Sequence, residues 1–192
     1  MNKDKSLKKL RMQIEKVQDA KRFEHTLGVC YTASCLAMVF GGDVRSAQIA
    51  GLLHDCAKGM SDKKRLAICE KAGLEVTDVE RKNPFLLHAK VGAYLAETKY
   101  QFEDPDILNA VRYHTTGRPE MSLLEKIIFI ADYIEPGRKQ APNLDRIRPV
   151  AFTDLDQALC MILEDTLAYL KQNGGEIDPA TDCTYQYYIR RK

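Results

Sequence analysis

Apolar residues recur at helical spacing along almost the whole chain, and no stretch alternates apolar and polar residues as a half-buried strand would. Helix signals divide this pattern into segments. Gly41 is a typical stop, whereas Asp104 before Pro105 is a typical start. Ser122 and Glu125 form a capping box ahead of an apolar run. The sequence therefore predicts an all-α protein, a bundle of about eight or nine helices.

The length of 192 residues fits one ordinary domain, with room for a short appendage but not for a second full core. Apolar residues make up 45% of the chain and charged residues 29%, a balance typical of globular proteins rather than disordered ones. We expect a single domain with its core over about residues 20–172. An N-terminal helix would precede it within residues 1–19, and a tail helix would follow within residues 176–192.

The net charge of +2 is too small to indicate a nucleic-acid binder, and the basic residues cluster only at the two ends of the chain. The N-terminus has positive charge but no apolar core of a signal peptide after it. The longest mostly apolar stretch, 29–40, is too short to cross a bilayer. We therefore expect a cytoplasmic protein with no membrane partner and no specific nucleic-acid partner.

None of the six cysteines forms a C-x-x-C pair, and several occupy apolar positions of helical patterns. This arrangement argues against both a structural zinc site and a disulfide framework. We expect reduced, buried thiols that pack as small hydrophobic groups.

The sequence has four histidines, and each lies in a segment predicted to be mostly buried. His54 is followed directly by Asp55, and Asp132 interrupts the apolar run 127–134. One buried histidine is usually an ordinary core residue, but six buried polar groups are costly unless they are paired or coordinated. A shared metal site would account for all of them. The candidate ligands are His25, His54, Asp55, His88, His114 and Asp132.

Imidazoles mixed with carboxylates suit iron, manganese or zinc, whereas magnesium and calcium favour oxygen ligands alone. A closed structural zinc site needs only four ligands, so six candidates favour two ions with open positions. Two ions of this kind can activate a shared hydroxide for attack on phosphorus. The ligand set alone does not choose between the three metals.

The order His25, then His54-Asp55, then Asp132 resembles the signature of the HD-domain phosphohydrolases. The two additional histidines between them, His88 and His114, resemble those of the dinuclear branch of that superfamily. The sequence motifs at residues 51–58, 114–117 and 130–138 are similar to those of the bacterial YqeK-type diadenosine tetraphosphatases. The resemblance covers about residues 22–170. It implies an HD-domain helical bundle and an enzyme that cleaves diadenosine tetraphosphate symmetrically to two ADP, by attack of a metal-bound hydroxide.

The same resemblance implies roles for the candidate ligands. Asp55 would bridge two metal ions and take part in catalysis. His25, His54 and Asp132 would complete the shell of one ion, and His88 with His114 that of the other. Iron is the metal expected from the resemblance, and ADP or GDP would bind as a product-like ligand.

Phosphate groups also need cationic and polar partners outside the metal shell. Lys58 lies one helical turn after His54, and its alternative role is that of a surface lysine ending a helix. Arg138 follows a Pro-Gly turn after Asp132, and Arg22 precedes His25 by three residues. We therefore regard Lys58 as a catalytic and substrate-binding candidate. The other substrate-binding candidates are Arg22, Thr115, Thr116, Gly117, Tyr133 and Arg138.

Two other functions remain open at this point. The first is another HD enzyme, which would act on nucleoside mono- or triphosphates with the same metal site. The second is a non-catalytic nucleotide sensor or a ribosome-associated module, whose binding would weaken steeply with salt. The sequence also leaves open whether the protein is a monomer or a homodimer.

Overall fold

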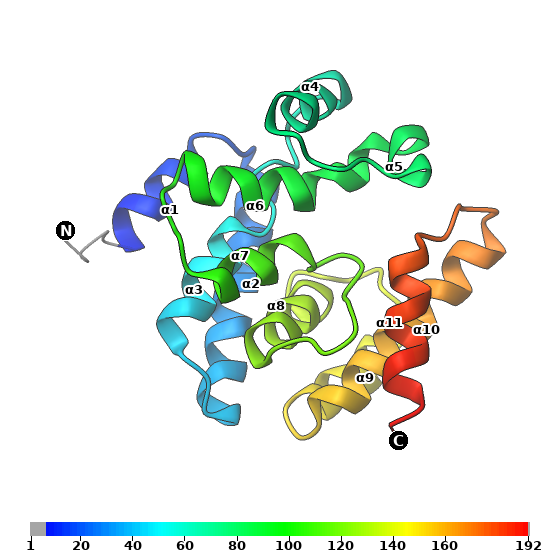
Figure 1. The fold of residues 1–192 in the computed structure, drawn as a ribbon. Helices are drawn as coiled ribbons and strands as arrows, with labels where there is room; N and C mark the ends of the chain where they lie inside the picture. The colour runs from blue at the N-terminus through cyan, green and yellow to red at the C-terminus, as the bar shows by residue number, and fades with distance from the viewer. Residues whose placement is uncertain (1–6, 192) are drawn as a thin grey trace.

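A computed structural model of the protein describes residues 7–191. These residues form eleven α-helices and one 3-10 helix (η1) and contain no strand, which confirms the all-α class (Figure 1). The helices are α1 (Leu7–Glu15), α2 (Ala20–Phe40), α3 (Val44–Leu53), α4 (Asp62–Ala72), α5 (Asp78–Lys82), η1 (Pro84–Leu87), α6 (His88–Thr98), α7 (Pro105–Arg112), α8 (Leu123–Ile134), α9 (Leu144–Ala151), α10 (Leu155–Gln172) and α11 (Pro179–Ile189).

The helix count exceeds the expected eight or nine because of two short helices, α5 and α9, of five and eight residues. Helix α9 contains Pro149, and its first residue follows Asn143, which adopts a left-handed conformation and makes no capping bond. The segment that leads into α6 begins as the 3-10 turn η1 and becomes α-helical at His88. These differences concern boundaries and short elements, not the fold class.

Capping side chains explain where most helices begin. Asp19, Asp43 and Asp104 each accept a hydrogen bond from a backbone N–H in the first turn of the helix that follows. The capping box of Ser122 and Glu125 is present at the start of α8. These bonds are local in the chain, which is why the sequence predicts these starts well.

The centre of the molecule is built around α2, α3 and α8, with α7 packed against α3 and α8. Gly51 in α3 allows the closest approach, since a Cβ there would lie 2.8 Å from the Cα of Cys30 in α2. One large cluster of buried side chains runs from α1 to α11, and a small second one joins α4, η1 and α6. Close packing of α2 on α3 fixes the relative positions of two of the segments that carry the candidate ligands.

The tail helix α11 packs on α10, as expected for a tail helix. Its Tyr188 is buried, and the hydroxyl accepts a hydrogen bond from the backbone N–H of Met121 at 2.9 Å. Gly117 lies beneath this helix with a φ of +64°, and a Cβ there would lie 2.7 Å from Cγ2 of Thr184. Helix α11 therefore holds the segment between α7 and α8 in place.

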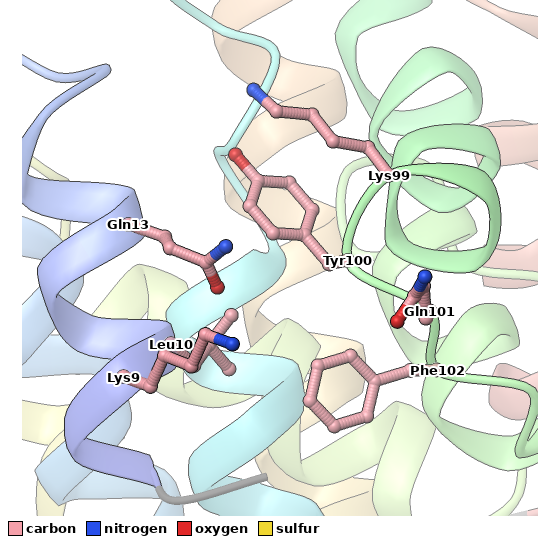
Figure 2. Close-up of a pocket in the computed structure, with 7 residues that line it drawn as sticks. All are labelled: Lys9, Leu10, Gln13, Lys99, Tyr100, Gln101 and Phe102. Carbon is pink, nitrogen blue, oxygen red and sulfur yellow. The ribbon is translucent and has the colours of Figure 1, made fainter.

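Helix α1 is anchored by Leu10 and Ile14, which are buried against the rest of the fold. A small hollow of about 60 Å³ separates α1 from the segment after α6, where Tyr100 and Phe102 face the side chains of α1 (Figure 2). None of the six candidate ligands lines this hollow. Residues 1–6, which include part of the basic N-terminal group, lie outside the described residues. Within residues 7–191, no helix combines the length and the apolar character that crossing a membrane requires.

Candidate functional site

Five segments of the chain bring the six candidate ligands together. His25 lies within α2, His88 is the first residue of α6, and Asp132 lies in the last turn of α8. His54 directly follows α3, and His114 lies two residues beyond the end of α7. His54 and His114 therefore lie in the turns that follow helices, not on the helices themselves. Both are nevertheless buried, as is His88.

Asp55 lies at the centre of this cluster, and its two carboxylate oxygens face different histidines. Oδ2 lies 3.8 Å from Nε2 of His54. Oδ1 lies 3.3 Å from Nε2 of His88 and 3.6 Å from Nε2 of His114. A carboxylate in this position can bind one metal ion through each oxygen.

Two groups of three ligand atoms follow from this arrangement, and Asp55 belongs to both. His25, His54 and Asp55 form one group, and Asp55, His88 and His114 form the other, with the atoms of each group within 4.8 Å of one another. Asp132 adjoins the first group, because its Oδ1 lies 3.0 Å from Nε2 of His25 and 3.8 Å from Nε2 of His54.

The backbone orients three of the four imidazoles. Nδ1 of His54, His88 and His114 lies 2.7, 2.6 and 2.8 Å from the carbonyl oxygen three residues earlier in each case. A carbonyl can only accept, so these rings carry their proton on Nδ1 and present the lone pair of Nε2 to the cluster. Such a bond on the outer nitrogen is typical of histidines that bind metals.

Glu135 performs the same task for His25, and sequence reasoning missed it. Its Oε1 lies 3.0 Å from Nδ1 of His25, and its Oε2 accepts from the backbone N–H of Gly137 at 2.5 Å. Gly28 makes room for the carboxylate, since a Cβ there would lie 2.4 Å from Oε2. Glu135 is the residue that follows the last residue of α8, and no pattern in the sequence distinguishes it from a surface acid.

Burial and neighbouring charges keep the site ready for a cation. Burial lowers the pKa of His54 to about 4 and that of His88 to about 3, so both rings are neutral at pH 7. Burial opposes ionisation of Asp55, but three neighbours outweigh burial and hold the pKa of Asp55 well below the usual range: the His54 ring, which is protonated in the acid range where Asp55 titrates, then His114 and the Lys58 ammonium. Asp132 behaves in the same way through its hydrogen bond with His25. Neutral imidazoles beside ionised carboxylates are the forms that bind metal ions.

Two buried atoms of the cluster have no hydrogen-bond partner within residues 7–191: Nε2 of His54 and Oδ1 of Asp55. Nε2 of His88 also lies 3.2 Å from Nε2 of His114, so two lone pairs face each other. Buried polar atoms without partners are costly, and a cation between them removes that cost. The residues present therefore fit a pair of metal ions.

Three cationic side chains surround the cluster. Nζ of Lys58 lies 3.1 Å from Nε2 of His88 and 3.6 Å from Oδ1 of Asp55. Arg22 contacts Oδ2 of Asp55, and Arg138 contacts Oδ1 of Asp132, each at 2.8 Å. All three line a hollow of about 770 Å³ that reaches Asp55, which we call the first hollow. A polyanion entering it would meet these cations next to the candidate metal ligands.

Comparison with known proteins adds a family to this geometry. The sequence pattern of the HD domain matches residues 22–137, a stretch that contains all six candidate ligands. The chain belongs to the HD-domain family. The HD-domain symmetrical bis(5'-nucleosyl)-tetraphosphatases of Bacillus subtilis and Staphylococcus aureus are similar to it. The first is 41% identical over 98% of both chains, and the second is 37% identical over 93% of this chain and 91% of that one.

A solved HD structure is also similar. The crystal structure of an HD superfamily hydrolase described as involved in NAD metabolism, from Clostridium acetobutylicum, has a TM-score of 0.94 to this chain. The two are 43% identical, and the match covers 97% of this chain and 98% of that one. The HD fold therefore extends over nearly the whole chain, beyond the 22–137 segment.

The remaining substrate-binding candidates of this HD protein lie in three different places. Thr115 and Thr116 line a separate hollow of about 420 Å³, which we call the second hollow. Gly117 lines neither hollow and is buried against Thr184. Tyr133 lines neither hollow, and its hydroxyl contacts the carbonyl of Pro142 at 3.2 Å. Packing accounts for these last two residues, whereas the two threonines face open space.

Arg65 was also missed, because it lies in the charged helix α4. It is buried, and its guanidinium donates to the carbonyls of Lys58 at 3.1 Å and Pro84 at 3.0 Å. These bonds tie the segment that carries Lys58 to the turn that leads to His88. Arg65 thus fixes the position of Lys58 relative to the second group of HD ligands.

Proposed function

We propose that this protein hydrolyses diadenosine tetraphosphate symmetrically to two ADP, using two metal ions held by the HD cluster. The observation that carries the proposal is the position of Asp55, whose two oxygens face two different groups of histidines. The relatives of B. subtilis and S. aureus, which carry the name symmetrical bis(5'-nucleosyl)-tetraphosphatase and match nearly the full chain, support the substrate.

In this proposal Asp55 would help to hold both ions. His25, His54 and Asp132 would hold the first ion, and His88 and His114 would hold the second. Such ions, when bound, activate a water for attack on phosphorus and neutralise the phosphate oxygens. Iron is the metal we favour, on the resemblance to the diadenosine tetraphosphatases, and manganese or zinc would also suit these ligands.

The chain itself supplies the contacts that orient the polyphosphate. Lys58 lies between His88 and Asp55, where its ammonium can neutralise charge on the attacked phosphate. Arg22 and Arg138 line the first hollow, and each planar guanidinium group can donate two hydrogen bonds to the oxygens of one phosphate. The anhydride bond breaks with negative charge building on the leaving ADP, so fixed cations nearby lower the barrier.

Product identification tests the proposal. We would purify the protein anaerobically, measure its metal content, and assay it on diadenosine tetraphosphate, ATP, AMP and NAD. NAD belongs in the panel because of the description of the C. acetobutylicum protein. ADP as the sole product of diadenosine tetraphosphate supports the proposal. Formation of ATP with AMP contradicts symmetric cleavage, and turnover of ATP or AMP alone would favour the other HD activity.

Metal stoichiometry tests the ligand roles independently of activity. Asp55→Ala should lose both ions, because each group of ligands includes Asp55. His114→Ala should keep one ion per chain, since it removes a ligand of the second group only. Asp145→Ala, an exposed acid on α9, is the matched control and should keep two. Two ions retained in Asp55→Ala would refute the bridging role.

A further inference from the structure

The second hollow lies beside the edge of the cluster formed by His88 and His114. Their chain neighbours Ala89 and Thr115 both line it. The rest of its lining comes from α5 and the segment before it, from η1 and α6, from the end of α7 and from the start of α11. It shares no lining residue with the first hollow, which is lined by His25 and Asp55. The first hollow is thus lined by candidate ligands themselves, and the second by the chain neighbours of His88 and His114.

Three side chains that line the second hollow carry polar groups without a hydrogen-bond partner among residues 7–191. They are the guanidinium of Arg112 and the hydroxyls of Tyr113 and Thr115. Lys90, also in the lining, differs, because its ammonium is paired with Glu80 at 2.8 Å. Arg112 is partly buried, and without an acceptor on the protein its guanidinium is available to an anionic or polar ligand in the hollow.

The chemistry of this lining suits a nucleotide. A guanidinium can bind a phosphate, and a threonine hydroxyl can bind a ribose hydroxyl. Three carboxylates also line the hollow: Glu80 is paired with Lys90, Asp178 caps α11, and Glu75 can accept a hydrogen bond from a ribose hydroxyl. The half-buried ring of Tyr113 offers an aromatic surface to a base, and the guanidinium carbon of Arg118 lies 5.4 Å from its centroid. The volume of about 420 Å³ falls within the range of small-molecule sites, which is roughly 300–1,000 Å³.

We infer that the second hollow binds one nucleoside end of the substrate while the other end occupies the first hollow. This inference rests on the proposed function, because a dinucleoside tetraphosphate cut at its centre has two equal halves that extend in opposite directions from the reacting phosphates. Each half needs its own site on one side of the metal cluster. Arg112, Tyr113 and Thr115 then determine specificity for a substrate with two nucleoside ends.

Filling the second hollow provides the test. Ala180 lines it from α11, and its backbone N–H donates to the capping side chain of Asp178, a bond that a larger side chain at position 180 leaves intact. Ala180→Phe should therefore occupy the hollow without touching a metal ligand. Gln186→Phe is the matched control, because it adds the same ring to an exposed position of the same helix.

Calorimetric titration of the metal-loaded protein with ADP measures the sites directly. We expect two ADP per chain in the unaltered protein and in Gln186→Phe, and one in Ala180→Phe. In steady-state assays, Ala180→Phe should raise KM for diadenosine tetraphosphate about tenfold with little change in kcat, as expected for lost binding away from the reacting bond. Adenosine tetraphosphate, which has one nucleoside end, can use the first hollow alone and should change less than about twofold in KM.

The possible failures are distinguishable. If the unaltered protein forms two ADP but binds a single ADP per chain, the inference is overturned and the proposed function stands. The same holds if Ala180→Phe binds two ADP and keeps its KM. If the metal-loaded protein forms no ADP from diadenosine tetraphosphate, both are overturned.

Discussion

Oε1 of Glu135 lies 3.0 Å from Nδ1 of His25, and Nε2 of the same ring lies 3.0 Å from Oδ1 of Asp132. His25 is thus the one imidazole of the cluster that a side chain, rather than a backbone carbonyl, orients. Burial alone would lower the pKa of His25, but the two carboxylates outweigh burial and raise it. The charge of Glu135 also makes the ring a stronger electron donor toward a metal ion.

Glu135→Gln should therefore weaken metal binding at His25. The amide keeps the size and an acceptor oxygen but removes the charge, and changes at such positions typically cost about 10- to 100-fold in metal affinity or activity. Competition with a chelator, followed by metal analysis, measures the effect. Glu97→Gln, at an exposed position on α6, is the control. Equal metal affinity in both variants would show that Glu135 has no such role.

Gly28→Ala should reproduce that loss by a different route. The new Cβ would lie 2.4 Å from Oε2 of Glu135 and 3.1 Å from its Cδ, so the carboxylate must move away from His25. We expect a drop in metal affinity similar to that of Glu135→Gln, and no further loss when the two changes are combined, because both act through one contact. A double-mutant cycle with additive losses would contradict this coupling.

Lys58→Met should lower turnover while leaving two ions per chain. The substitution keeps an unbranched side chain but removes the ammonium beside His88 and Asp55. Losing one fixed charge at a reacting oxygen costs on the order of 10²-fold in kcat. Lys63→Met, exposed on α4, should leave kcat unchanged. If Lys58→Met keeps the kcat of the parent protein, the lysine is only a surface residue.

The six cysteines should divide into two classes of reactivity. Burial raises the pKa of Cys30 to about 11 and that of Cys56 to about 12, so both remain thiols at pH 8. Cys35 and Cys183 are exposed, contrary to the expectation of uniformly buried thiols. Native protein treated with iodoacetamide at pH 8 should gain two adducts by mass spectrometry, and denatured protein six. Labelling of Cys56 in native protein at the rate of Cys35 would contradict this burial.

The sequence predicted well those features that depend on nearby residues. Asp43 and Ser122 mark helix starts because their side chains bond to backbone groups three residues away. The six candidate ligands could be identified because polar residues in apolar segments need a common explanation. Their convergence in the structure agrees with that explanation.

Features that depend on distant contacts could not be read from the chain. Glu135 precedes a Pro-Gly pair and reads as a surface charge, and only its contact with Gly28 of α2 shows why it is buried. Arg65 stands among exposed lysines, and its burial depends on carbonyls that other segments supply. Thr115 and Tyr133 each follow a candidate ligand directly in the chain, so the sequence does not distinguish them. In the fold, Thr115 lines the second hollow, whereas the hydroxyl of Tyr133 contacts the carbonyl of Pro142.

The carbonyl bonds of His54, His88 and His114 bear on how this site can change during evolution. Every amino acid carries the same carbonyl, so substitutions at positions 85 and 111 leave the hydrogen-bond acceptor in place, whereas a Cβ at position 51 would meet the backbone of Cys30. Point mutations at positions 85 and 111 therefore leave the acceptors of His88 and His114 in place as long as the helix ends keep their shape. His25 has no such protection, because its acceptor is a side chain. A single codon change at Glu135 or Gly28 can therefore disturb the orientation of His25, whereas the rings held by backbone carbonyls are less exposed to such changes.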